Sequence, residues 1–253
     1  MAKPKYRADE LLAAQGLTES RERAKRLVMA GLVYAESAGG RVVVDKPGRM
    51  FGEETAFFVA QGERFVSRGG HKLLTAIEKF HLDVSGKVCL DAGASTGGFT
   101  DCLLQFGAAR VYAVDVGRAQ LHEKLRADPR VVSLEGVNLR LAGPELLPEA
   151  VDLAVIDVSF ISLTLVLPAI AKMLAREAEV VALIKPQFEL GPGRADKGVV
   201  RDVAARQEAV DKVTGFASSV LGFEPVGVEP AAIKGPKGNQ EFVAYFKVHG
   251  APG

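Results

Sequence analysis

The stretch VCLDAGASTGGFTDCLLQFGAARVYAVD, residues 88–115, decides the fold. A short apolar run ends on Asp91, a turn of small residues follows at 93–98, and a helical segment leads to a second apolar run that ends on Asp115. This order predicts a β-α-β unit, in which a helix joins two parallel strands. We therefore expect an α/β fold with a mostly parallel, Rossmann-like sheet.

The turn within this unit is suited to holding a ligand. Its glycines let a ligand approach the backbone, the helix start offers free N–H groups, and the acid after the second strand can accept hydrogen bonds from ribose hydroxyls. The spacing G-x-G-x-x-G, which packs a pyrophosphate against the helix, is absent, so S-adenosylmethionine (SAM) fits better than a dinucleotide. A dinucleotide, or a crossover without ligand, remains an alternative. The residues expected around the cofactor are Asp91, Gly93, Ala94, Ser95, Gly97, Gly98, Phe99, Asp115, Val116, Asn138 and Asp157.

Length and composition indicate a globular protein of one large and one smaller domain. Of the 253 residues, 48% are apolar and 25% charged, which is ordinary for a folded chain. The longest uncharged apolar stretch, 158–171, is shorter than the roughly 20 residues that a membrane helix needs, and no signal peptide opens the chain. The only two cysteines, Cys89 and Cys102, are interpreted as packing residues. We expect a cytoplasmic protein without membrane contact.

Positive charge is concentrated near the N-terminus. Residues 1–50 contain ten Lys or Arg against six Asp or Glu, whereas residues 51–253 contain 22 against 25. Two helices are expected at 7–15 and 19–30, followed by a hairpin at 32–36 and 41–46 around Gly39 and Gly40. The second helix has four cations within six residues, which either bind phosphates or form a solvated face partly neutralised by Glu19 and Glu22. They are Arg21, Arg23, Lys25 and Arg26.

Further strands are expected at 131–138, 151–159 and 179–186, and helices at 71–80, 163–175 and 202–221, with Pro168 kinking the 163–175 helix or marking its true start. Because carboxyl ends of parallel strands meet at one edge, Asp91, Asp115, Asp157 and Lys185 should converge there. The glycine-rich loop 190–200 is either a flap or a long connection. Two last strands, 224–233 and 241–248, predict an antiparallel C-terminal hairpin, typical of SAM-dependent methyltransferases.

Two sets of short sequence motifs resemble known families. Residues 7–33, RADELLAAQGLTESRERAKRLVMAGLV, followed by VVVDKPG at 42–48, resemble the small RNA-binding domain named after ribosomal protein S-four. This resemblance implies that Arg21, Arg23, Lys25 and Arg26, joined by Arg7, contact structured RNA through shape and phosphates. It also implies an RNA-binding domain at 1–59, a linker at 60–66 and a second domain at 67–253.

The second set lies in the larger domain. Four short motifs resemble those that carry the Lys-Asp-Lys-Glu tetrad of FtsJ-like ribose 2′-O-methyltransferases: SRGGHKL, IDVSFIS, ALIKPQFE and GNQEF. In this chain the tetrad would be Lys72, Asp157, Lys185 and Glu241. Without this context Lys72, at a helix start, would be interpreted as solvent-facing. From about residue 5 to 247 the chain is similar to the TlyA family of ribosomal RNA 2′-O-methyltransferases, also called haemolysin A. The family suggests cytidine as the target and ribosomal RNA or ribosomal subunits as partners.

The reaction that this resemblance implies needs a general base. A ribose hydroxyl must lose its proton as it attacks a methyl group in line. Lysine has an ordinary pKa of about 10.4, but burial beside a second cation can lower it by up to ~3–5 units. Lys185 is the predicted base and Lys72 the neighbouring cation that also orients the 2′-hydroxyl. Asp157 would orient Lys185, and Glu241 would position Lys72 or the ribose.

Other functions remain as alternatives. An RNA base methyltransferase would carry prolines after the fourth strand, which the sequence DVSF at 157–160 lacks. A non-catalytic RNA-binding assembly factor would bind ribosomal RNA and transfer nothing. A pore-forming haemolysin would need a membrane-spanning stretch. No metal is expected, because the four histidines lack the spacing of metal ligands.

Overall fold

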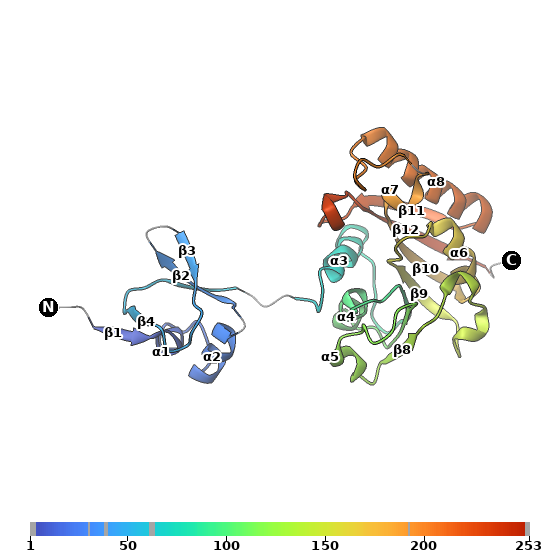
Figure 1. The fold of residues 1–253 in the computed structure, drawn as a ribbon. Helices are drawn as coiled ribbons and strands as arrows, with labels where there is room; N and C mark the ends of the chain where they lie inside the picture. Colours follow the sequence, from blue (N-terminus) through green and yellow to red (C-terminus); the bar gives the residue numbers. More distant parts are fainter. Residues whose placement is uncertain (1–3, 30, 38–39, 61–63, 192, 251–253) are drawn as a thin grey trace. The chain divides into compact units, whose positions relative to one another are not determined.

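The structure, a computed structural model, describes residues 4–29, 31–37, 40–60, 64–191 and 193–250 (Figure 1). The chain divides into two compact units, Met1–Arg64 and Phe65–Gly253. The linker expected at 60–66 includes residues 61–63, and the turn expected at Gly39 and Gly40 includes Gly39, so both predictions fall partly outside the described residues. No helix within the described ranges is long and apolar enough to cross a membrane.

The first unit packs two helices against small sheets. Apolar residues spaced three and four apart in each helix, such as Leu11, Leu12, Ala24 and Val28, are buried in one cluster. The strands β1, β4 and β5 were not expected, because three-residue strands leave no periodic pattern to detect. The elements are β1 (Lys5–Arg7), α1 (Ala8–Ala14), α2 (Arg21–Met29), β2 (Val33–Ser37), β3 (Gly40–Val43), β4 (Met50–Gly52) and β5 (Phe57–Val59).

The second unit alternates strands with helices along the chain. It begins with α3 (Gly69–Phe80), β6 (Val88–Ala92), α4 (Gly98–Gln105), β7 (Arg110–Asp115), α5 (Glu123–Arg126), β8 (Val131–Glu135), η1 (Leu139–Leu141), η2 (Pro144–Leu146) and β9 (Val151–Ile156). It continues with α6 (Leu163–Ala171), β10 (Leu174–Ile184), α7 (Pro186–Glu189), α8 (Val203–Leu221), β11 (Glu224–Pro230), η3 (Pro236–Gly238) and β12 (Phe242–His249).

The predicted fold class is confirmed in this unit. One seven-stranded sheet has the order β11-β12-β10-β9-β6-β7-β8, and β12 is antiparallel to both of its neighbours. Its strands alternate between two buried clusters: Leu90 and Ile156 belong to the cluster with α6 and α8, whereas Cys89 and Val155 belong to the cluster with α3 and α4. The sheet is therefore covered on both faces, as strands with continuous apolar runs require (Figure 1).

Two predicted boundaries are wrong in the segment 163–179. Helix α6 ends at Ala171, and β10 already begins at Leu174, where Leu174 pairs with Val151 before an irregularity in register. Pro168 lies inside the helix and does not mark its start, because the Ser162 side chain accepts a hydrogen bond from the Thr164 amide and caps the helix there. Pairing of Leu174 with β9 and of Glu177 with His249 in β12 extends β10 through its charged residues, which no sequence pattern predicts.

Candidate active site

The strand ends bring four segments of the chain to one edge of the sheet. Strands β6, β9 and β10 are parallel neighbours, with Ala92 paired to Ile156 and Ile156 paired to Ala182. The segments that follow them, starting at Gly93, Asp157 and Lys185, therefore leave the sheet side by side. The antiparallel strand β12 begins at the same edge, because Phe242 pairs with Ile184. That register sets Glu241 opposite Lys185.

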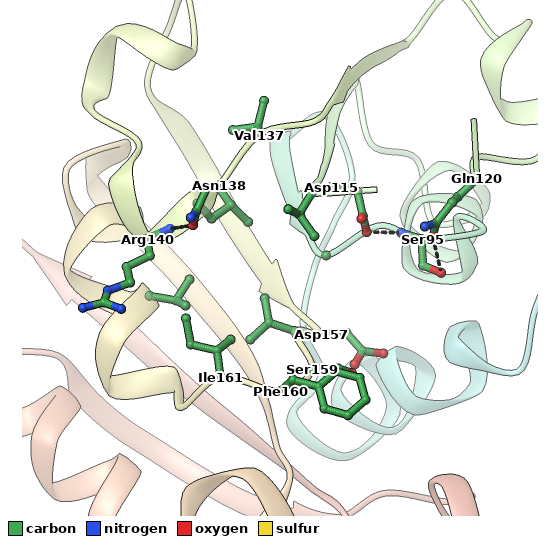
Figure 2. A pocket seen from close by; sticks show the side chains of 15 residues that line it. Ser95, Asp115, Gln120, Val137, Asn138, Arg140, Asp157, Ser159, Phe160 and Ile161 are labelled. Atoms are coloured by element: carbon green, nitrogen blue, oxygen red, sulfur yellow. Dashed lines mark hydrogen bonds between the residues drawn. The ribbon is translucent and has the colours of Figure 1, made fainter. Parts of the chain in front are cut away.

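A cavity of about 470 Å³ opens beside these strand ends (Figure 2). Six residues of the expected cofactor set line it: Gly93, Ser95, Asp115, Val116, Asn138 and Asp157. Sequence reasoning missed the others, namely Gln120, Val137, Leu139, Arg140, Val158, Ser159, Phe160, Ile161 and Val166. Most of these follow Asn138 or Asp157 directly, so extending each predicted strand end into its loop would have found them.

The polar groups of the cavity are fixed by the backbone around them. The two carboxylate oxygens of Asp115 accept hydrogen bonds from the amides of Ser95, at 2.8 Å, and Gly117, at 2.6 Å. The side-chain oxygen of Asn138 accepts from the Arg140 amide at 3.1 Å. Figure 2 shows both side chains among the residues that line the cavity, Asp115 at the end of β7 and Asn138 just before η1. A carboxylate, an amide and an apolar wall are what a nucleoside needs.

Five residues of the expected cofactor set do not line this cavity: Asp91, Ala94, Gly97, Gly98 and Phe99. The glycines serve close packing instead. A methyl group on Gly98 would lie 2.8 Å from the Gly70 amide nitrogen, and one on Gly97, whose φ is +94°, would lie 2.8 Å from Leu121. Gly93 combines both constraints, since its φ is +91° and a methyl group would lie 2.6 Å from the carbonyl oxygen of Asp157. These glycines let the turn pack against its neighbours.

Asp91 lies under the site. It is fully buried, and its Oδ2 accepts a hydrogen bond from Thr100 Oγ1 at 2.6 Å. Among the described residues, its Oδ1 has no hydrogen-bond partner. Burial raises the pKa of this carboxyl to about 7 against the Thr100 hydrogen bond, and the nearby Asp157 and Asp115 raise it further. Asp91 is thus a buried group that supports the turn.

The four tetrad residues form two close lysine–acid pairs. Lys72 Nζ lies 2.6 Å from Glu241 Oε2, and Lys185 Nζ lies 2.5 Å from Asp157 Oδ1. The pairs adjoin, because Ile184 pairs with Phe242 and so sets Lys185 beside Glu241. Lys72 is 8% exposed, so the solvent-facing interpretation is wrong: α3 packs on β12 and carries Lys72 to the buried Glu241.

The loop after Asp157 is attached to the segment after Lys185. Ser159 Oγ accepts a hydrogen bond from Lys185 Nζ at 2.8 Å, and the rings of Phe160 and Phe188 lie 4.9 Å apart. The buried Glu189 accepts hydrogen bonds from Ser162 Oγ, at 2.5 Å, and from the Leu163 amide, at 2.8 Å. These contacts fix the loop that carries Asp157 and one wall of the cavity.

The loop 190–200 is tied to the turn before Glu241. Asn239, which is buried, donates a hydrogen bond from Nδ2 to the Gly198 carbonyl at 2.8 Å and accepts one from the Val200 amide at 3.1 Å. The flap interpretation of this loop stays a prediction. No group of three or more His, Cys, Asp or Glu residues that could hold a metal ion occurs in the part of the chain that the structure describes.

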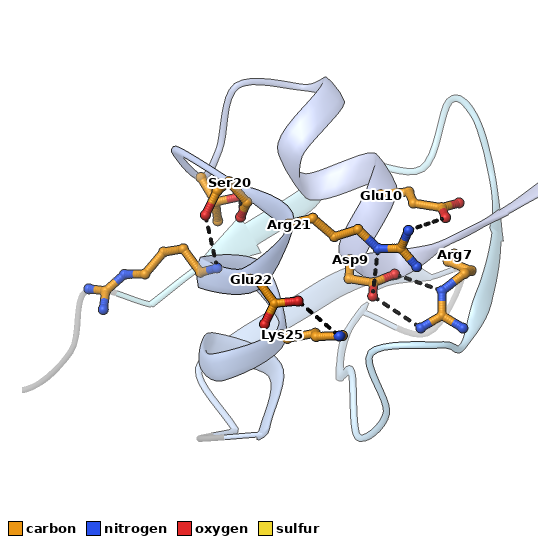
Figure 3. Close-up of polar contacts among 9 residues, drawn as sticks. Arg7, Asp9, Glu10, Ser20, Arg21, Glu22 and Lys25 are labelled. Carbon is orange, nitrogen blue, oxygen red and sulfur yellow. Dashed lines mark hydrogen bonds and ion pairs between the residues drawn. The ribbon is translucent and has the colours of Figure 1, made fainter.

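Two basic residues of the first unit, Arg7 and Arg21, meet at one buried acid (Figure 3). Asp9 accepts from Arg7 Nε at 3.0 Å and from Arg21 Nε at 3.2 Å. Burial alone would raise the pKa of Asp9, but the hydrogen bonds from these two guanidinium groups outweigh it and hold the pKa below its usual value. Sequence reasoning missed this acid, which fixes Arg7 and Arg21 on adjoining elements.

The other three basic residues lie along α2. Lys25 pairs with Glu22 at 3.0 Å, as the neutralised-face interpretation expected, whereas Arg23 and Arg26 are exposed. The structure thus brings Arg7 and Arg21 together, and it leaves the charges of Arg23 and Arg26 directed to solvent.

Comparisons with known proteins agree with this geometry. A family model described as FtsJ-like methyltransferase matches residues 65–248. The 16S/23S rRNA (cytidine-2′-O)-methyltransferase TlyA of Mycobacterium tuberculosis is 46% identical over 244 residues, which cover 95% of this chain and 89% of that protein.

Solved structures are similar to this chain in fold. A putative hemolysin from Streptococcus thermophilus is 47% identical, with a TM-score of 0.74, over 99% of this chain and 91% of that one. Fibrillarin from Aeropyrum pernix, solved with natively bound SAM, is 17% identical, with a TM-score of 0.50, over 71% of this chain and 74% of that one. The likeness to fibrillarin concerns the fold alone.

Proposed function

The chain belongs to the TlyA family of FtsJ-like, SAM-dependent methyltransferases, and we propose that it methylates the 2′-hydroxyl of a ribose in ribosomal RNA, with Lys185 as the general base. The observation that carries the proposal is the pair of adjoining lysine–acid contacts, Lys185–Asp157 and Lys72–Glu241, at the sheet edge beside the cavity. A single lysine–acid pair could be structural, but two of them at a ligand edge form a site for proton transfer.

The residues that line the cavity suit SAM. Asp115 presents a carboxylate to ribose hydroxyls, Asn138 an amide to an adenine edge, and Val116 an exposed apolar side chain to the face of a base. Bound there, SAM supplies an electrophilic methyl group. Asp157 lines the cavity and also contacts Lys185, so the base lies beside the place where the methyl group would be presented.

The chemistry that we assign to Lys185 is removal of the ribose proton. Lys185 acts as the neutral amine, and its side chain is 7% exposed, so little water competes for the position that the hydroxyl takes. Lys72, held by Glu241, places a second positive charge beside the site, where it stabilises the oxygen as its proton leaves. Asp157 keeps Lys185 directed toward the cavity.

We further propose that the first unit holds the RNA. Arg7, Arg21, Arg23, Lys25 and Arg26 form its basic surface, and the guanidinium groups on Asp9 are set for contacts to phosphates. Cytidine is the proposed target nucleoside, on the strength of the relative's name. Contacts of this kind weaken as salt rises, because binding releases counterions from the RNA.

The test of the base is Lys185→Ala, with Lys87→Ala as a matched control. Lys87 also forms an ion pair, with Glu179, but at the opposite end of the sheet. We expect Lys185→Ala to lower turnover by about 100-fold or more, with SAM affinity and melting temperature held, because general bases contribute about 10²–10⁴-fold. Lys87→Ala should leave turnover unchanged. Near-full turnover in Lys185→Ala would contradict the mechanism.

A further inference from the structure

Lys185 has two hydrogen-bond acceptors, of which the tetrad supplies only one. Its Nζ lies 2.5 Å from Asp157 Oδ1 and 2.8 Å from Ser159 Oγ. Ser159 lies three residues beyond the end of β9 and also lines the cavity. Its hydroxyl is therefore the one neutral group that the structure shows bonded to the amine of the proposed base.

The geometry of an amine gives this contact a consequence. A neutral lysine nitrogen has one carbon, two N–H bonds and one lone pair, arranged as a tetrahedron. When both N–H bonds point to acceptors, the lone pair must occupy the remaining direction. With Asp157 as the sole acceptor, rotation about the bond from Cε to Nζ leaves two directions open to the lone pair.

We propose that Ser159 is a positioning residue that sets the direction of the Lys185 lone pair, an inference that rests on the proposed function. The hydroxyl accepts one N–H bond and Asp157 accepts the other, so the lone pair faces the third direction, where the ribose hydroxyl gives up its proton. The O–H bond of the ribose then breaks and a new N–H bond forms on Lys185. At the same time the oxygen bonds to the methyl carbon, and the carbon–sulfur bond of SAM breaks, which leaves the cofactor as a neutral thioether.

The loop holds Ser159 in place without help from its hydroxyl. Phe160 packs on Phe188, and the Glu189 carboxylate binds Ser162 and the Leu163 amide. Ser159 is itself exposed, so its side chain fills no space in the core. Removing the hydroxyl should therefore leave the loop, the cavity and the fold as they are.

The test compares Ser159→Ala with Ser159→Thr, which keeps the hydroxyl. We expect kcat for methyl transfer to fall about 10–100-fold in the alanine variant, because the orientation of the proton acceptor is lost. The KM for SAM and the RNA affinity should stay within about twofold of wild type, and the melting temperature within about one degree. The threonine variant should recover kcat to within about threefold.

Unchanged kcat in Ser159→Ala would overturn the inference, as would equal loss in the threonine variant. A fall in SAM affinity that accounts for the lost rate would also overturn it, since the hydroxyl would then serve the cofactor. These outcomes are distinct from failure of the proposed function, which would show as a wild-type protein that makes no 2′-O-methylated nucleoside.

Discussion

A glycine that touches no substrate should control the position of Glu241. Gly235 lies in the turn before β12, and a methyl group built on it would overlap the carboxylate of Glu241, with Oε2 at 3.0 Å and the other atoms of the carboxylate closer still. Its φ is not in the left-handed region, so alanine adds no backbone strain there. The three atoms nearest to this added methyl group all belong to Glu241, so Gly235→Ala acts first on that side chain.

The size of the effect follows from the surroundings of Glu241. The side chain is fully buried, and its Oε2 lies 2.6 Å from Lys72 Nζ. To make room for the methyl group, the carboxylate must move by about 1 Å, and it then either takes Lys72 with it or breaks the contact. Overpacking of this kind costs about 1–3 kcal/mol, which lowers the melting temperature by roughly 2–10 °C in a domain of this size. A misplacement of about 1 Å lowers kcat by about 100-fold.

The assay is methyl transfer from labelled SAM at saturating RNA, with Gly215→Ala as the control. Gly215 lies on α8, and a methyl group there meets no atom within 4 Å, so this variant should keep its kcat and gain about 0.5–1 kcal/mol of stability. SAM affinity should be unchanged in both. If Gly235→Ala keeps wild-type kcat although its melting temperature falls, Glu241 is not part of the catalytic machinery.

Three further perturbations test other parts of the molecule. Removing residues 1–60 should abolish RNA methylation and leave SAM affinity nearly unchanged; equal RNA affinity in the shortened protein would refute the role of the first unit. The pKa of Asp91 is raised from about 3.8 to about 7, so the stability it contributes is full below about pH 4 and is lost as pH rises through about 7. The melting temperature of wild type relative to Asp91→Asn should therefore fall from pH 5 to pH 8, and parallel curves would contradict this. Gly93→Ala should lose SAM affinity and about 1–3 kcal/mol of stability, because its φ is +91° and the methyl group would lie 2.6 Å from the Asp157 carbonyl; unchanged SAM binding would refute it.

The sheet and its ligand edge could be predicted from sequence because they depend on short local patterns. Strands β7, β9 and β10 each finish with an apolar run, so Asp115, Asp157 and Lys185 are found at the edge by reading along the chain. Residues Lys72 and Glu241 lie 169 positions apart, and no local pattern relates them. The motifs around them, which resemble those of the family, identified both residues, but only the packing of α3 on β12 explains their contact.

The parts that sequence reasoning missed depend on tertiary contacts. Ser159 lies in a short loop and Glu189 ends the four-residue helix α7, and in such short segments neither periodicity nor charge distinguishes them from other polar residues. Asp9 was missed in the first unit for a similar reason. In the sequence it is one acid among basic residues, and only its burial shows that it is more than a neutralising charge. The early start of β10 arises from pairing with β9, which overrides the weak local preference of the chain.

The most direct test of the central claim is the position of the methyl group in the product. Wild-type protein is incubated with methyl-labelled SAM and unmodified ribosomal subunits or naked ribosomal RNA, and the RNA is digested to nucleosides. The label should appear in a 2′-O-methyl nucleoside, proposed to be cytidine, and should be lost in Lys185→Ala. Label in a methylated base would contradict the assignment of Lys72, Asp157, Lys185 and Glu241, and no label with any of these substrates would contradict the proposed activity itself.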